Sequence, residues 1–140
     1  MTWLLLIYKV PPEPSARRVY VWRKLKRLGA ILLHDAVWVL PATEHTREQF
    51  QWLAAEIDEM EGETMVWQAQ LIGSEDALAR QFTAQVDEIY QEVLTALAQD
   101  AADLDLLSRR YQQATAQDYF HSPLGTQVRE ALIAARGGNR

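Results

Sequence analysis

The chain has 140 residues, of which 49% are apolar and 24% are charged, and its formal net charge is −5. This length and composition are typical of a globular protein with a core of its own, and they favour one domain. The absence of cysteine excludes disulfides, thiolate metal sites and cysteine nucleophiles. The apolar run Trp3–Ile7 is too short to span a bilayer and lacks the flanks of a signal peptide, so we expect no membrane association and a cytoplasmic protein.

Charge is distributed unevenly along the chain. Residues 1–34 contain seven cations and one carboxylate, a net charge of +6, whereas residues 35–140 have a net charge of −11. Local fields rather than net charge decide which anions approach a surface. The N-terminal segment is therefore the first place to look for a binding function.

The first half of the chain predicts alternating strands and helices. Pro and Gly residues end most of the apolar runs, and helical or alternating periodicity separates helices from strands. In chain order we expect a central strand at Trp3–Val10, a helix from Pro14 and Ser15 to Leu28, a hairpin of Ala30–Leu33 and Ala36–Leu40, a helix capped by Thr43 and ended by Gly62, and a strand at Thr64–Ile72.

This order predicts an α+β fold of the ferredoxin-like, split βαβ type, an antiparallel four-stranded sheet with two helices on one face. Residues 74–140 follow as a helical extension of about three helices: a long one after Ser74, one at Asp100–Gln117 and one at Leu124–Ala135, with Gly137–Arg140 expected to fray. We expect residues 1–73 and 74–140 to pack as one structural unit.

Two stretches resemble the N-terminal domain of the chromate-resistance protein ChrB. The first is WLLLIYKVPPEPSARRVYVWRKLKRLGAILLHDAVWVLP, with its Pro-Ser helix start and its Arg-Val-x-Val-Trp-Arg-x-Leu-Lys core, and the second is Gln117–Pro123. The resemblance implies a regulatory or sensing module in chromate resistance. In that family the domain is generally linked to a larger C-terminal domain.

A more distant resemblance is to the ferredoxin-like proteins of CRISPR adaptation and the related domain of the phenylacetate repressor PaaX. It implies the same fold and a homodimer, which we expect to form through the sheet or the long helices. The nuclease activity of the CRISPR proteins is attributed to an aspartate at the end of the first strand, where this chain has Lys9. Because lysine cannot bind a hard divalent cation, we expect no enzyme, no metal and no other cofactor.

A candidate oxyanion site lies where the first strand meets the first helix. Lys9 ends the strand, Ser15 opens the helix, and Arg18 is predicted on its buried side near Trp22. Backbone N–H groups of a helix N-terminus and a planar guanidinium both suit a tetrahedral anion such as chromate, sulfate or phosphate. The alternative is that Arg18 pairs with Asp35 or Glu56 and has no ligand.

The remaining cations of the first helix predict a surface for nucleic acid or an acidic partner. Acidic residues that would neutralise them are missing from the helix itself. The C-terminal helices carry carboxylates that would neutralise this surface internally: Glu88, Glu92, Asp100, Asp103 and Asp105. The cations concerned are Arg17, Arg23, Lys24, Lys26 and Arg27.

Other polar and aromatic residues give weaker signals. His34, His45 and His121 are too far apart in sequence for a helical metal motif, and Asp118 near His121 is expected to anchor a loop rather than to catalyse. The five tryptophans fall at apolar positions and predict core or interface packing. The alternatives to a regulatory module are an interaction subunit whose basic helix docks an acidic protein, and a degenerate metal-dependent nuclease.

Overall fold

The structure is a computed structural model that describes residues 1–137. Residues 138–140, most of the tail predicted to fray, lie outside the described residues. The elements in chain order are β1 (Trp3–Lys9), α1 (Ser15–Leu28), β2 (Ile31–His34), β3 (Val37–Pro41), α2 (Glu44–Glu59), β4 (Glu63–Ala69), α3 (Asp76–Leu97), α4 (Leu104–Ala116) and α5 (Pro123–Gly137).

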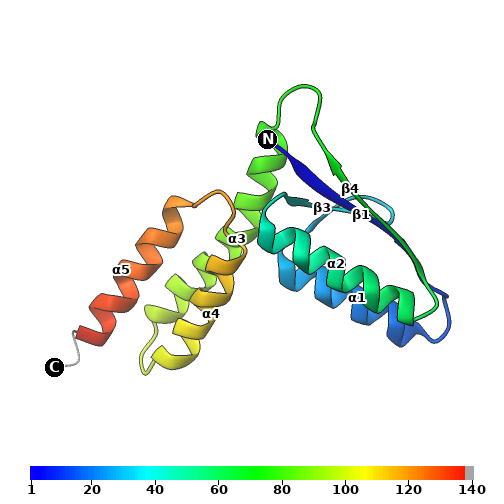
Figure 1. The fold of residues 1–140 in the computed structure, drawn as a ribbon. Helices are drawn as coiled ribbons and strands as arrows, with labels where there is room; N and C mark the ends of the chain where they lie inside the picture. Colours follow the sequence, from blue (N-terminus) through cyan, green and yellow to red (C-terminus); the bar gives the residue numbers. More distant parts are fainter. Residues whose placement is uncertain (138–140) are drawn as a thin grey trace. The chain divides into compact units, whose positions relative to one another are not determined.

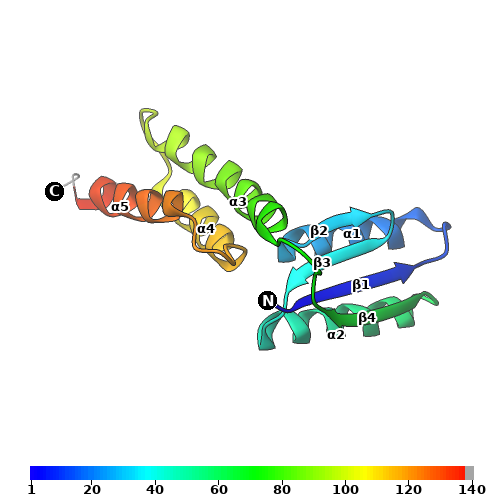
Figure 2. The same ribbon diagram turned by 90° about the horizontal axis from the view of Figure 1, so that it is seen from above.

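The sheet has the order β2-β3-β1-β4, and every neighbouring pair is antiparallel. Leu6 of β1 lies opposite Trp38 on one side and Val66 on the other. Helices α1 and α2 cover one face of this sheet (Figures 1 and 2). The predicted α+β fold, a ferredoxin-like sheet followed by a helical extension, is confirmed.

Local signals explain why the elements begin and end where they do. Thr43 and Thr46 form a reciprocal capping box at the start of α2, with N···O distances of 3.0 and 2.8 Å. Gly29 ends α1 with a φ of 79°, in the left-handed region that favours glycine. The β2–β3 turn has no glycine, and Asp35 takes the positive φ of 42° in its place.

The prediction for the last strand was wrong at its C-terminal end. The sequence predicted a strand to Ile72, but β4 ends at Ala69. Ala69 lies opposite Trp3, where β1 begins, so the residues after it have no neighbouring strand to pair with. Ile72 is 99% exposed as a result.

The described chain divides into two compact units, Met1–Asp76 and the residues from Ala77 onward. In the first unit, Leu4 and Leu6 of the central strand are buried together with residues of both helices, among them Val21, Leu25 and Phe50. The Met1 ammonium and the Trp3 indole both contact Glu75, at 3.5 and 3.2 Å. The expectation that the helical extension packs on this unit stays a prediction.

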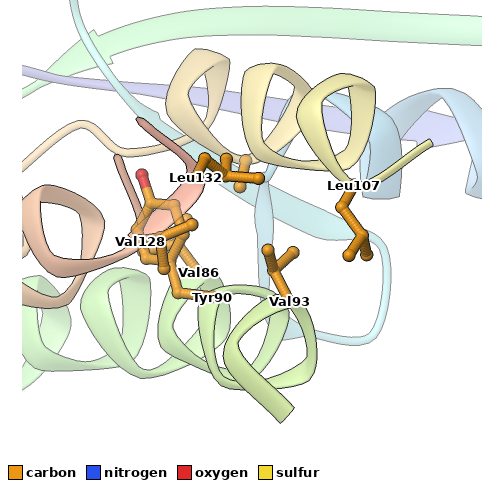
Figure 3. Close-up of a cluster of buried hydrophobic side chains, with 7 residues drawn as sticks. Val86, Tyr90, Val93, Leu107, Val128 and Leu132 are labelled. Carbon is orange, nitrogen blue, oxygen red and sulfur yellow. The ribbon is translucent and has the colours of Figure 1, made fainter. Parts of the chain in front are cut away.

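The second unit buries the apolar stripes of its three helices against one another (Figure 3). Gly125 allows α5 to approach α3 closely, because a Cβ there would lie 2.9 Å from the Tyr90 hydroxyl oxygen. Phe82 packs on Tyr119 and Phe120 of the loop before α5, with ring centroids 6.0 and 5.9 Å apart. The buried cluster consists of Val86, Tyr90, Val93, Leu107, Ala114, Val128 and Leu132.

Candidate anion-binding site

The candidate site lies beside the first two turns of α1. Pro14 is the N-cap of this helix and supplies no side-chain hydrogen bond, and the first turn has no acidic residue. The positive end of the helix dipole is therefore not neutralised by the helix's own side chains. At the other end, Lys26 and Arg27 lie in the last turn, where cations interact favourably with the dipole.

A surface hollow of about 500 Å³ lies along this part of α1. Two of the three residues predicted to bind an oxyanion, Ser15 and Arg18, line it together. Lys9 does not line it; this lysine is exposed at the end of β1, opposite Glu63 of β4. The full lining is Tyr8, Ser15, Arg18, Val19, Trp22 and Arg23.

Tyr8 is a member of the site that the sequence analysis missed. Successive side chains of a strand point to opposite faces, so Tyr8 and Lys9 cannot both face α1. Burial raises the pKa of Tyr8 above its usual value, and the positive charge of Arg18 acts in the opposite direction. Tyr8 therefore adds a neutral hydroxyl beside the Arg18 guanidinium.

The position of Arg18 differs from the prediction. The sequence placed it on the buried side of the helix, but Arg18 is exposed. Within residues 1–137 it forms no salt bridge with Asp35 or Glu56, and Glu56 instead accepts a hydrogen bond from the Tyr20 hydroxyl. The physical reason is that α1 buries only a narrow stripe, Val21 and Leu25, so that neighbouring positions reach solvent.

The five tryptophans divide into a buried and an exposed group. The sequence predicted core or interface packing for all five tryptophans, and Trp3 and Trp38 are buried in the core. Trp22 and Trp67 are each 51% exposed, however, and Trp52 is 65% exposed. Trp22 thus supplies an accessible aromatic wall to the hollow instead of a core contact.

The other cations of α1 have different surroundings. Arg17 donates a hydrogen bond to the carbonyl oxygen of Met60 at 3.0 Å, which holds α1 to the end of α2. Lys24 lies 5.6 Å from the centre of the Tyr20 ring, within cation–π range. Among residues 1–137, Arg23 forms no salt bridge; it is exposed, as are Lys26 and Arg27.

Some carboxylates proposed to neutralise α1 have partners within the second unit. Glu92 pairs with Arg110 at 3.0 Å, and Asp105 pairs with Arg136 at 3.1 Å. Asp103 caps α4 by accepting a hydrogen bond from the backbone N–H of Leu106 at 3.1 Å. Glu92 and Asp105, two of the carboxylates that could neutralise α1, thus pair with arginines of α4 and α5.

The polar loop before α5 has a structural role. Asp118 accepts hydrogen bonds from the Tyr90 hydroxyl and the Ser122 backbone N–H, both at 2.9 Å. Ser122 in turn donates its hydroxyl hydrogen to Asp87. The prediction that Asp118 anchors this loop is confirmed.

Residues 1–137 contain neither a cluster of metal ligands nor a helix that could span a membrane. This part of the chain has no group of three His, Asp or Glu side chains placed to hold a metal ion. Across the same residues, the helices are all too short or too polar to cross a lipid bilayer.

A four-stranded antiparallel sheet with two covering helices, one of them basic, defines a small α+β domain of the ferredoxin-like class. Residues 18–106 match the sequence model of the family described as "Protein ChrB, N-terminal". The matched residues include most of α1 and all the elements from β2 to α3. The chain belongs to this family.

A curated relative gives the same assignment. The chain is 29% identical over 119 residues to Protein ChrB of Cupriavidus metallidurans. The match covers 78% of this chain but 36% of the relative, so the chain spans about a third of that protein's length.

Proposed function

We propose that this chain is a regulatory or sensing module in chromate resistance, without catalytic activity, and that α1 binds an oxyanion in the hollow beside Trp22. Membership of the ChrB N-terminal family supports the role in chromate resistance. The observation that carries the binding proposal is the pair Arg18 and Arg23, two cations without a salt bridge within residues 1–137 that line one hollow.

The chemistry of the hollow suits a tetrahedral oxyanion. A guanidinium presents parallel N–H donors to two oxygens of such an anion, and the Ser15 and Tyr8 hydroxyls add further donors. Chromate, sulfate and phosphate share this shape, so the proposal covers the class and chromate is its first member to test.

Ligand-dependent thermal stability tests the proposal. A ligand that binds only the folded state at a hundredfold excess over Kd stabilises it by about 2.7 kcal/mol. We expect chromate or sulfate to raise the Tm of the full chain and Arg18→Gln to remove most of the shift. Arg109→Gln, an exposed arginine of α4, is the matched control and keeps the shift. Equal shifts in both variants, or none in the parent chain, refute the oxyanion site.

Nucleic acid is a second candidate ligand. Tyr20 and Trp22 are 38% and 51% exposed among the cations of α1, and exposed aromatics beside cations suit nucleic acid. If DNA binds this surface, the logarithm of the binding constant falls linearly with the logarithm of the salt concentration. We expect the double variant Arg23→Glu, Arg27→Glu to abolish it, measured by fluorescence anisotropy. Cleavage of the same DNA that a chelator stops would instead support the nuclease alternative.

A further inference from the structure

The outward face of α2 is an acidic surface with a tryptophan at its centre. The residues of this face recur at three- and four-residue spacing and are all exposed. Trp52, 65% exposed, contributes to a hollow of about 410 Å³ that Glu56 and Glu59 also line. We call this surface the acidic face; it consists of Glu44, Glu48, Gln51, Trp52, Ala55 and Glu59.

The outward face of α1 has the opposite charge. Val19, 45% exposed, lies on it with Arg23, Lys26 and Arg27, and all four are exposed. Helix α1 contains six cations and no carboxylate, whereas α2 contains five carboxylates and one arginine. We call the α1 surface the basic face; helices α1 and α2 lie side by side on the same side of the sheet (Figure 1).

The topology determines how the helical layers of two copies, each made of α1 and α2, can meet. Strands β1 and β3 are antiparallel, and each leads into one of the two helices, so α1 and α2 also run in opposite directions (Figure 1). A two-fold axis parallel to the helices brings α1 of each copy onto α2 of the other. An axis across the helices would bring α1 onto α1, where like charges repel.

We propose that two copies of this chain dock through their helical layers, with the basic face of each copy on the acidic face of the other. Charge complementarity favours a second copy of the chain as the partner, because each copy supplies one basic face and one acidic face at the same levels along the helices. The interface differs from the sheet or long-helix contact that the sequence suggested.

Contacts within one copy predict the register between two copies. Tyr20 is level with Glu56, and Arg17 is level with Met60. A two-fold axis parallel to the helices does not shift one copy along the other, so the same levels apply across the interface. Following the antiparallel helices by one and two turns places Arg23 near Trp52 and Arg27 near Glu48. A guanidinium over an indole is the most favourable cation–π pair, and Arg27 with Glu48 makes an ion pair.

This interface overlaps the hollow of the proposed oxyanion site, because Val19 and Arg23 belong to both, but it does not include Arg18. Arg18 and Trp22 lie on the flank of α1 away from Tyr20 and α2, whereas the basic face points outward. DNA on the basic face would compete with the second copy. The two proposals are tested by different residues: Arg18→Gln changes the hollow and leaves the basic face unchanged, whereas Glu48→Arg changes the acidic face and leaves the hollow unchanged. A failure of one proposal is therefore distinguishable from a failure of the other.

Sedimentation velocity of the full chain, with charge reversal, tests the proposal. We expect a dimer that weakens with rising salt, and at least about thirtyfold weaker association in Glu48→Arg and in Arg27→Glu, because each change converts two symmetric attractions into repulsions. The double variant Arg27→Glu, Glu48→Arg restores the charge pair and most of the association. Glu88→Arg makes the same charge change on α3 and is the control, without effect.

Two results would overturn the proposal. One is a monomer at every concentration tested in the parent chain. The other is a dimer that resists both reversals and is broken by Trp67→Glu, which would place the contact on the exposed sheet residues instead. Circular dichroism of each variant separates loss of association from loss of folding, and restoration by the double variant makes the same distinction independently.

Discussion

Two arginines of the second unit and two of the first have different surroundings. In the unit that begins at Ala77, Arg110 and Arg136 have carboxylate partners, and Asp118 is held by hydrogen bonds to Tyr90 and Ser122. In the unit of residues 1–76, Arg18 and Arg23 are exposed and form no salt bridge within the described chain. Satisfied polar groups stabilise a fold, whereas exposed cations without ion-pair partners leave binding capacity. This difference agrees with the proposal that the first unit binds a ligand, whereas the polar loop of the second unit has a packing role.

The largest expected effect is in the second unit. Phe82 is 2% exposed and its ring contacts Tyr119 and Phe120. We expect Phe82→Ala to lower the free energy of unfolding by about 3–5 kcal/mol, measured by urea denaturation. Leu106→Ala, at a position 53% exposed, is the control and changes it by less than about 1 kcal/mol. Equal losses in both variants would contradict this account of the loop.

Gly125→Ala tests the close approach of α5 to α3. The added Cβ would lie 2.9 Å from the Tyr90 hydroxyl oxygen and 3.0 Å from the ring carbon that bears it, and both belong to a fully buried side chain. We expect a loss of about 1–3 kcal/mol in the free energy of unfolding. Gly137→Ala, where a Cβ meets nothing within 4 Å, serves as the comparison in the same assay. A neutral Gly125→Ala would mean that the helices separate at no cost.

Alkaline pH tests the burial of the loop aromatics. Burial raises the pKa of Tyr119 to about 12, so the folded state holds this proton more tightly than the unfolded state. The associated stability is complete below the unfolded-state pKa of about 10 and is lost as pH rises towards 12. Between pH 10 and pH 12, we expect the free energy of unfolding of Tyr119→Phe to fall by about 1–2 kcal/mol less than that of the parent chain. Parallel pH profiles of the two proteins would show that Tyr119 does not contribute.

The smallest expected effect is in the first unit. Without ligand, Arg18→Gln changes the free energy of unfolding by less than about 0.5 kcal/mol, because the side chain is exposed and has no ion-pair partner within residues 1–137. Urea denaturation in a buffer without chromate, sulfate or phosphate measures this change in the free energy of unfolding. A loss above about 1.5 kcal/mol would show that Arg18 supports the fold and would remove the contrast between the units.

The sequence was sufficient for the order of the elements and for part of the site. Pro11, Gly29 and Pro41 each lie at the end of a run with strand or helix periodicity, and such local signals do not depend on tertiary contacts. Ser15 and Arg18 were predicted to lie close together for the same reason, since a helix start is a local event, and they line one hollow; their role in binding stays a prediction. Tyr8 was missed because alternation shows that Tyr8 and Lys9 face opposite ways but not which of them faces the helix.

Sequence alone determined the strand and helix order, the concentration of cations in the first helix and the α+β class, because each follows from residues close together in the chain. Only the tertiary structure decided which side chains remain exposed. Whether Trp22, Trp52 and Arg18 are covered depends on where a helix lies on its sheet, and that depends on contacts between residues far apart in sequence. The hollow on α1 and the exposure of the two oppositely charged helical faces are consequences of that packing.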